Sequence, residues 1–120
     1  MKKSILIADD DKAFLDAMAL RCENLGPRVH TASDGAQVLM QVSQNPPDLL
    51  ILDINMPSGN GLDVAARLLQ DPMIPPVPVI FCSGRSDQES FAYDSGASDV
   101  LTKPVNALTL AKKTRALLSL

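Results

Sequence analysis

The sequence predicts an α/β protein built on a parallel β-sheet, and two observations support this fold class. Short apolar runs alternate along the chain with longer segments in which apolar residues recur at helical spacing, the pattern of repeated βα units. The apolar runs also lack the apolar–polar alternation of half-exposed strands, so we expect strands that are buried on both faces. Together these patterns predict five βα units in one sheet.

Each expected strand is an apolar run bounded by polar or turn-forming residues. The strands are expected at about residues 4–8, 29–32, 49–52, 79–82 and 100–101. Helical spacing between them predicts helices at about residues 13–25, 36–42, 62–69, 87–95 and 106–118.

Glycine and proline mark the places where these elements end. Gly26-Pro27 stops the first helix, and the Asn-Pro-Pro at residues 45–47 stops the second. A loop with Pro57 and two glycines follows the third strand. Four prolines between residues 72 and 78 disfavour a helix there and predict a stiff, extended connector.

Length and composition are those of one globular domain. The chain has 120 residues, of which 46% are hydrophobic and 21% charged, and its net charge is −3. This acidic balance argues against direct binding to nucleic acid or to an anionic membrane. No apolar run approaches the roughly 20 residues of a membrane span, and the short run after Lys2-Lys3 soon meets three aspartates. We therefore expect a cytoplasmic protein rather than an exported one.

The cysteines and the single histidine are expected to have no chemical role. Cys22 and Cys82 lack a CxxC spacing and lie in apolar stretches, so we expect two reduced thiols in the core. His30 lies on the second strand and is expected to be structural or exposed rather than a phosphoryl carrier. A P-loop, a G-x-G-x-x-G motif and a G-x-S-x-G elbow are absent, which argues against the corresponding enzyme classes.

Acidic residues follow the first and third strands, at the edge where parallel sheets bind ligands. Asp9, Asp10 and Asp11 come directly after the first strand, and Asp53 ends the third. One acid is enough to cap the next helix, and that role alone accounts for Asp11. Grouped carboxylates repel one another unless a cation or protons intervene, so we expect Asp9, Asp10 and Asp53 to hold a hard cation. Asp53 is either a turn-forming residue or a nucleophile that forms an aspartyl phosphate.

Polar residues also follow the fourth and fifth strands. Ser83 can donate its hydroxyl to a phosphate oxygen, and Gly84 permits a close backbone approach. Lys103, held by the following Pro104, can pair its ammonium with a carboxylate or a phosphate. A Ser-Gly turn and a surface lysine are common, so the shared sheet edge is what makes these residues candidates.

Taken in order, these motifs resemble the receiver domain of two-component response regulators over about residues 3–118. The resemblance implies a single doubly wound (βα)5 sandwich, with a flavodoxin-like parallel sheet of strand order 2-1-3-4-5. The matching segments are Ile5–Asp11, Asp48–Pro57, Gly61, Ser83-Gly84, Gly96-Ala97 and Lys103-Pro104.

The resemblance implies a phosphorylation-switched signalling role. Asp53 would accept a phosphoryl group from a histidine kinase or a histidine phosphotransfer protein. Lys103 and Ser83 would contact the phosphoryl oxygens through their side chains, and Met56 and Gly84 through their backbones. The surface of the fourth helix, fifth strand and last helix would then change and control an unidentified output domain or protein. Independently of the resemblance, basic residues among the leucines of the last helix suit either a solvated surface or contact with a partner, including a second copy of the chain. The chain would promote its own phosphorylation and dephosphorylation without being a turnover enzyme.

The resemblance also implies a Mg²⁺ or Mn²⁺ cofactor. Asp10 and Asp53 would bind the ion directly, Asp9 would act through a water molecule, and Asn55 would contribute its backbone carbonyl.

Two apolar residues depart from the family pattern. Val100 stands where the family usually carries an aromatic switch residue three positions before the lysine, and Val105 replaces a frequent phenylalanine. The output surface is therefore expected to be non-standard, or to be read by a partner that is insensitive to the aromatic. Arg85 and Asn55 occupy the places that tune the phosphoryl lifetime in this family.

Two other functions remain open at this point. A haloacid-dehalogenase-like phosphatase would use Asp53 as its nucleophile, but such enzymes carry a second acid two residues later, where this chain has Asn55. A pseudo-receiver that never takes phosphate is disfavoured by the full set of acids with Ser83 and Lys103, while Val100 keeps it open.

Overall fold

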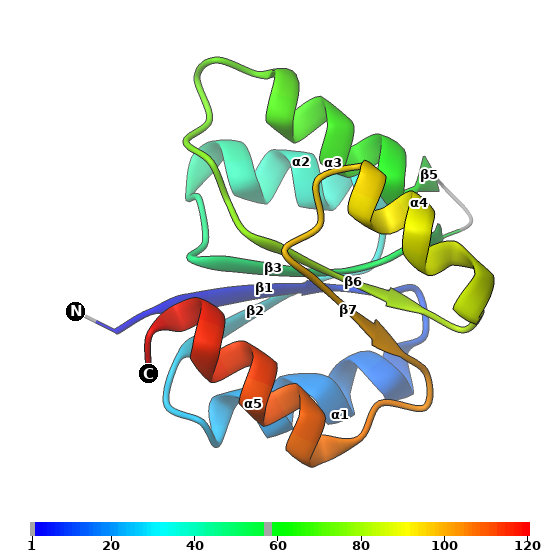
Figure 1. The fold of residues 1–120 in the computed structure, drawn as a ribbon. Coiled ribbons are helices and arrows are strands. Elements are labelled where there is room, and N and C mark those ends of the chain that lie inside the picture. Colours follow the sequence, from blue (N-terminus) through cyan, green and yellow to red (C-terminus); the bar gives the residue numbers. More distant parts are fainter. Residues whose placement is uncertain (1, 57–58) are drawn as a thin grey trace.

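The computed structural model describes residues 2–56 and 59–120, and its centre is a five-stranded sheet (Figure 1). Its strands are β1 (Ser4–Ala8), β2 (Arg28–Ala32), β3 (Leu49–Asp53), β6 (Val79–Ser83) and β7 (Asp99–Thr102). Neighbouring strands are parallel and lie in the order β2-β1-β3-β6-β7. In chain order this is the arrangement 2-1-3-4-5, so the predicted topology is confirmed.

Helices cover both faces of the sheet (Figure 1). One face carries α1 (Lys12–Glu23) and α5 (Ala107–Leu118). The other face carries α2 (Gly35–Gln44), α3 (Gly61–Gln70) and α4 (Glu89–Asp94). The doubly wound sandwich is therefore confirmed as well.

Two local features differ from the prediction. The loop after β3 contains a small antiparallel pair, β4 (Asn55–Met56) with β5 (Gly59–Asn60), which was not predicted. The helix predicted over residues 87–95 is two elements, a 3₁₀-helix η1 (Ser86–Gln88) followed by the six-residue α4. Predicted boundaries elsewhere hold within about two residues, and the proline-rich connector carries no helix.

The sheet divides the core into two apolar layers. All residues of β3 and β6 are buried, because helices cover both faces of these central strands. Even-numbered residues of β1 and β3, such as Leu6 and Leu50, pack toward α2 and α3, whereas odd-numbered residues such as Ile7 and Ile51 pack toward α1 and α5. The one buried residue of α4 is Ala92.

Polar side chains fix the start of four helices. In each case the side-chain oxygen of the residue before the helix accepts a hydrogen bond from a backbone N–H of the first turn. These N-cap residues are Asp11, Asp34, Asn60 and Asn106. Asp11 therefore caps α1, as predicted, which leaves Asp9 and Asp10 free for other roles.

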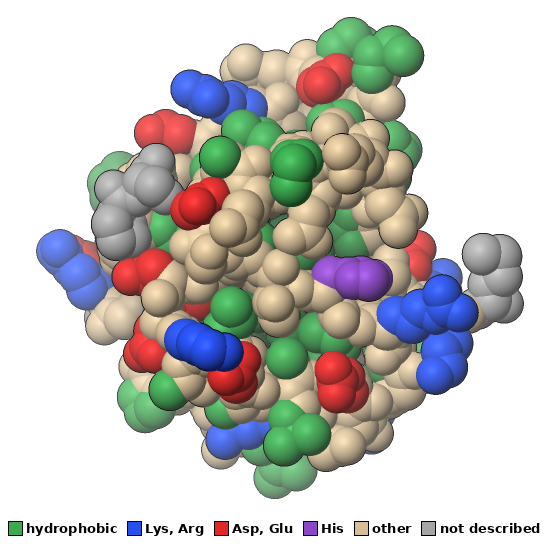
Figure 2. Space-filling model, turned by 180° about the vertical axis from the view of Figure 1, so that it is seen from behind, with side chains coloured by type: hydrophobic (Ala, Val, Ile, Leu, Met, Phe, Trp, Pro, Cys, Tyr) green, Lys and Arg blue, Asp and Glu red, His purple; other side chains and the backbone are tan. Residues whose placement is uncertain are grey.

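The residues expected to be inert are placed accordingly. Cys22 and Cys82 are buried free thiols, and burial raises their pKa to about 11 and about 12. His30 is exposed on β2, and the histidine is visible at the surface in Figure 2, where acidic and basic side chains both occur on the same face. Within the described ranges, no helix has the length and apolar character needed to cross a membrane.

Candidate functional site

Four strands of the sheet end beside one another and bring their polar residues to a single edge. Asp9 follows β1, Asp53 ends β3, Ser83 ends β6 and Lys103 follows β7. Backbone hydrogen bonds continue past the strand ends, from Lys103 N to the carbonyl of Ser83 at 2.8 Å and from Ile54 N to the carbonyl of Cys82 at 3.0 Å. The site residues are therefore held by the sheet itself rather than by a mobile loop.

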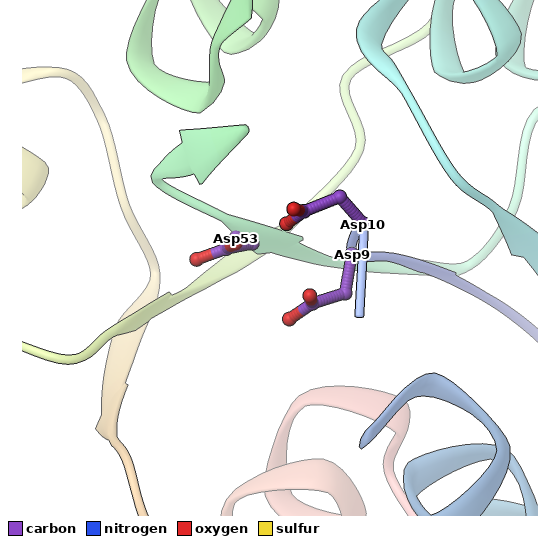
Figure 3. Close-up of side chains that lie close together, drawn as sticks. All are labelled: Asp9, Asp10 and Asp53. Carbon is purple, nitrogen blue, oxygen red and sulfur yellow. The ribbon is translucent and has the colours of Figure 1, made fainter. Parts of the chain in front are cut away.

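Three carboxylates face a common space at this edge (Figure 3). One oxygen from each of Asp9, Asp10 and Asp53 lies within 4.8 Å of the others. Asp9 and Asp53 are 1% and 4% exposed, whereas Asp10 is exposed. An all-oxygen donor set with one side open to solvent suits a hard divalent cation that keeps several of its waters. The residues therefore fit the predicted ion.

Lys103 places a positive charge between the two buried carboxylates. Its Nζ donates to Asp9 Oδ2 at 2.8 Å and lies 3.5 Å from Asp53 Oδ1. The ring of Phe14, on the first turn of α1, lies beneath the ammonium with its centroid 4.4 Å from Nζ. The lysine thus partly neutralises the negative charge of the two buried acids.

The electrostatics of the site disfavour a fully charged Asp53. Burial raises the pKa of Asp53 above its ordinary value of 3.8, and the charge of Asp9 raises it further, while Lys103 offsets this only in part. Burial lowers the pKa of Lys103, but the hydrogen bond to Asp9 and the charge of Asp53 outweigh it, so the pKa is raised. An arriving cation would relieve this excess of negative charge.

The Ser83 hydroxyl is turned toward residues that follow it in the chain. Its Oγ lies 2.7 Å from the Arg85 carbonyl oxygen and 2.6 Å from Gln88 Oε1, and it accepts a hydrogen bond from Arg85 N at 3.0 Å. The Arg85 guanidinium instead pairs with Asp87 at 2.7 Å, at the exposed surface.

Asn55 also contacts Gln88. The two side-chain amides form a reciprocal pair, with Nδ2 of Asn55 donating to Oε1 of Gln88 at 3.2 Å and Nε2 of Gln88 donating to Oδ1 of Asn55 at 3.3 Å. The backbone N–H of Asn55 points toward Asp53 Oδ1 at 3.4 Å. The loop after β3 is therefore tied both to the acid and to the start of α4.

The structure brings together most of the residues singled out in the sequence. Asp9, Asp10, Asp53 and Lys103 form one cluster, and Ser83 lies at the neighbouring strand end. Their individual roles in metal and phosphate binding stay predictions. The roles assigned to the backbone of the remaining residues also stay predictions: Asn55, Met56 and Gly84.

Three further features of the sequence concern the loop after Asp53, the peptide bond before Pro104 and the two departures from the family pattern. Pro57, predicted to lie in the loop after Asp53, is outside the described residues. The peptide bond between Lys103 and Pro104 is cis. Val100 and Val105, the two departures from the family pattern, are buried at 3% and 9% exposure.

Two residues at the site were missed in the sequence. Phe14 was assigned only to the apolar face of the first helix, and Gln88 only to the polar start of the fourth. Phe14 lies in the first turn of the helix that directly follows the aspartates, and this closeness in sequence could have indicated its place near the site. No comparable signal marks Gln88, because its contacts depend on how η1 turns back toward β3.

Comparisons with known proteins agree with this geometry. Residues 5–115 match the family model described as "Response regulator receiver domain". The chain is 36% identical over 116 residues to the DNA-binding dual master transcriptional regulator RpaA of Synechocystis, covering 95% of this chain and 48% of that protein. It is 33% identical over 120 residues to the response regulator PleD of Caulobacter vibrioides, covering 98% of this chain and 26% of that protein. The chain thus spans about half or less of the length of these relatives.

Solved structures give the same result. A putative response regulator from Chloroflexus aurantiacus superposes with a TM-score of 0.93 at 27% identity, with all of both chains covered. The receiver domain of the Francisella response regulator 1452 gives a TM-score of 0.90 at 27% identity, covering 98% of each chain. The family match over nearly the whole sequence, together with the acidic edge of the sheet, shows that this chain belongs to the response regulator receiver domain family of two-component systems.

Proposed function

We propose that this chain is a working receiver that takes a phosphoryl group on Asp53 from a phosphohistidine of a kinase or phosphotransfer protein. The observation that carries the proposal is the Lys103 ammonium held between Asp9 and Asp53, at 2.8 and 3.5 Å. The ammonium neutralises the buried acids, and it also supplies positive charge at the place where phosphoryl transfer to Asp53 needs it.

The chemistry assigns one step to Asp53. A carboxylate oxygen attacks the phosphorus, the new P–O bond forms as the P–N bond to the donor histidine breaks, and the released imidazole takes up a proton. Lys103 would exchange part of its contact with the carboxylates for the phosphoryl oxygens, and Ser83 would donate its hydroxyl to one of them. Positioning and charge neutralisation supply the catalysis, so the chain is not proposed to be a turnover enzyme.

The same acids are proposed to hold Mg²⁺ or Mn²⁺. Asp10 and Asp53 would be direct ligands together with the Asn55 carbonyl, and Asp9 would act through a water molecule. The ion would neutralise charge on the carboxylates and on the incoming phosphoryl group.

The output is proposed to pass through the surface of α4, β7 and α5. This surface exposes large apolar side chains, with Phe91 at 63%, Tyr93 at 50% and Leu108 at 82% exposure. Scattered exposed apolar residues are common, but these three lie on the two helices that flank the edge strand β7, where they suit contact with an output domain or with a second copy of the chain. The acidic net charge of −3 supports action through such a partner rather than on nucleic acid directly.

Intact mass spectrometry tests the central step. The protein is incubated with Mg²⁺ and acetyl phosphate, alongside Asp53→Asn and a sample containing EDTA. We expect one phosphoryl adduct on the unaltered protein and none in the other two samples. Absence of an adduct despite measurable Mg²⁺ binding would favour the pseudo-receiver, and continuous release of phosphate from a phosphomonoester would favour the phosphatase.

A further inference from the structure

Gln88 connects two residues that the proposed phosphorylation would use. Its Oε1 accepts hydrogen bonds from Ser83 Oγ at 2.6 Å and from Asn55 Nδ2 at 3.2 Å, and its Nε2 donates to Asn55 Oδ1 at 3.3 Å. An amide oxygen has two lone pairs, so it can serve both donors at once. Gln88 ends η1 directly before α4, and this contact therefore joins the β3 loop to the start of α4.

The Ser83 hydroxyl is fully engaged in this arrangement. Ser83 is 0% exposed, and its oxygen already accepts a hydrogen bond from Arg85 N. A hydroxyl has one proton, which here is directed to Gln88 or to the Arg85 carbonyl oxygen. Ser83 can therefore donate to a phosphoryl oxygen on Asp53 only by giving up these acceptors.

The neighbouring charged side chain does not take part in this arrangement. The Arg85 guanidinium pairs with Asp87 through two contacts, at 3.2 and 2.7 Å, on the exposed side of η1. Of these two side chains, Gln88 is the one that contacts both Ser83 and Asn55.

We propose that Gln88 is a positioning residue, a latch that holds the Ser83 hydroxyl and the Asn55 amide in the unphosphorylated state and is released when Ser83 turns to a phosphoryl group on Asp53. The proposal rests on the proposed function and adds to it the contact that phosphorylation must break. The latch stabilises the resting state alone, so it opposes phosphorylation. Release of the latch also frees Gln88, which directly precedes α4. Phosphorylation of Asp53 could therefore act on the output surface without an aromatic side chain in place of Val100.

The resting contact is tested first, without metal or phosphate. Urea unfolding is measured for the unaltered protein, Ser83→Ala, Gln88→Met and the double variant, since methionine keeps the side-chain length but removes the amide. If the two side chains interact, the double variant should lose less stability than the two single variants lose together. We expect its unfolding constant to be about fivefold smaller than the value that simple additivity predicts. Simple additivity of the two changes would overturn the latch.

The coupling to the acceptor is tested with beryllofluoride, a phosphoryl mimic, in the presence of Mg²⁺. Calorimetric titration is expected to show that Gln88→Met binds the mimic about three- to tenfold more tightly than the unaltered protein, because the resting state has lost its competing hydrogen bond. In the Ser83→Ala background the same change should give no gain. Gln41→Met is the matched control, since Gln41 donates to the Thr31 carbonyl at 2.9 Å, outside the Ser83–Gln88–Asn55 contact, and should leave the affinity unchanged.

The outcomes separate this proposal from the proposed function. If the unaltered protein binds beryllofluoride and Gln88→Met binds it equally or more weakly, the latch is wrong while the receiver function stands. Gln88→Ala provides a second variant, so that a packing effect of methionine cannot imitate that result. If the unaltered protein neither binds the mimic nor forms an adduct with acetyl phosphate, both proposals are overturned.

Discussion

Replacing Lys103 with methionine should destabilise the metal-free protein, because its ammonium is the internal counter-ion of two buried carboxylates. The ammonium lies 2.8 Å from Asp9 and 3.5 Å from Asp53. Removing one partner of a fully buried ion pair costs about 3–5 kcal/mol. The lysine side chain is 26% exposed, so solvent screens part of this effect, and we expect a loss of about 2 kcal/mol at pH 7. Methionine can still pack on Phe14, so the change removes charge more than contact.

The loss should diminish in acid. Without Lys103, the carboxylates of Asp9 and Asp53 repel each other, and a proton taken up by Asp53, whose pKa is already raised, relieves the repulsion. Urea unfolding followed by circular dichroism in EDTA, at pH 7 and pH 4, measures both effects, and 2 kcal/mol corresponds to a midpoint shift of about 1 M. Lys12→Met is the control, because its ion pair with Asp16 is exposed and contributes less than about 0.5 kcal/mol. A loss at Lys103 as small as that at Lys12, or one that is equal at both pH values, would refute this account of the site.

Three further substitutions and one labelling experiment test other parts of the structure. Asp53→Asn should raise the thermal midpoint at pH 7 in EDTA, because the pKa of Asp53 is raised in the folded protein. The contribution of protonated Asp53 to the stability of the fold is complete below the unfolded pKa of 3.8 and is lost as pH rises through the folded pKa. The advantage of asparagine should therefore vanish in acid. Thr114→Val should stabilise the protein by about 1 kcal/mol in urea unfolding, since the Thr114 hydroxyl is buried without a hydrogen-bond partner in the described part of the chain; a loss of stability would reveal a missed partner. Gly61→Ala should cost about 2 kcal/mol or more and reduce phosphorylation, because a Cβ there would overlap the Asp53 carbonyl oxygen; normal stability of this variant would contradict the contact. Cys22 and Cys82, at 0% and 1% exposure and with raised pKa values of about 11 and about 12, should resist alkylation at pH 8 until urea unfolds the protein, and rapid labelling of the native state would count against the described core.

The central strands of the sheet could be predicted because each of them is a run of several consecutive apolar residues. Runs such as residues 49–52 are apolar throughout, a pattern typical of a strand that is buried on both faces. The pair Asn55–Met56 with Gly59–Asn60 could not be found in this way, since two-residue strands have no periodicity. The 3₁₀ turn at Ser86–Gln88 was read as part of one helix because polar residues at a helix start fit either geometry.

The candidate site was predictable to the extent that topology determines it. Parallel strands place their carboxyl ends at one edge of the sheet, so Asp9 and Asp53, on the neighbouring strands β1 and β3, had to lie close together once the strand order was known. Lys103 follows β7, which β6 separates from β3, and it reaches both acids through its long side chain. The direction of individual side chains is set by packing and by local turns. The placement of Phe14 under the ammonium and the turning of Ser83 toward Gln88 therefore became visible only in three dimensions.

The short helix α4 is attached to the sheet by very little buried surface. Ala92 is its one buried residue, and burying a methyl group contributes about 0.8 kcal/mol, close to the net contribution of one hydrogen bond. By contrast, α3 buries Val64, Ala65 and Leu68. One hydrogen bond exchanged at Ser83 is therefore comparable in free energy to the burial of the Ala92 methyl group, whereas it is small beside the burial of the α3 side chains. The signal proposed to start at Asp53 would therefore need only a small free-energy change to reach α4, because that helix begins directly after Gln88, which contacts Ser83 and Asn55.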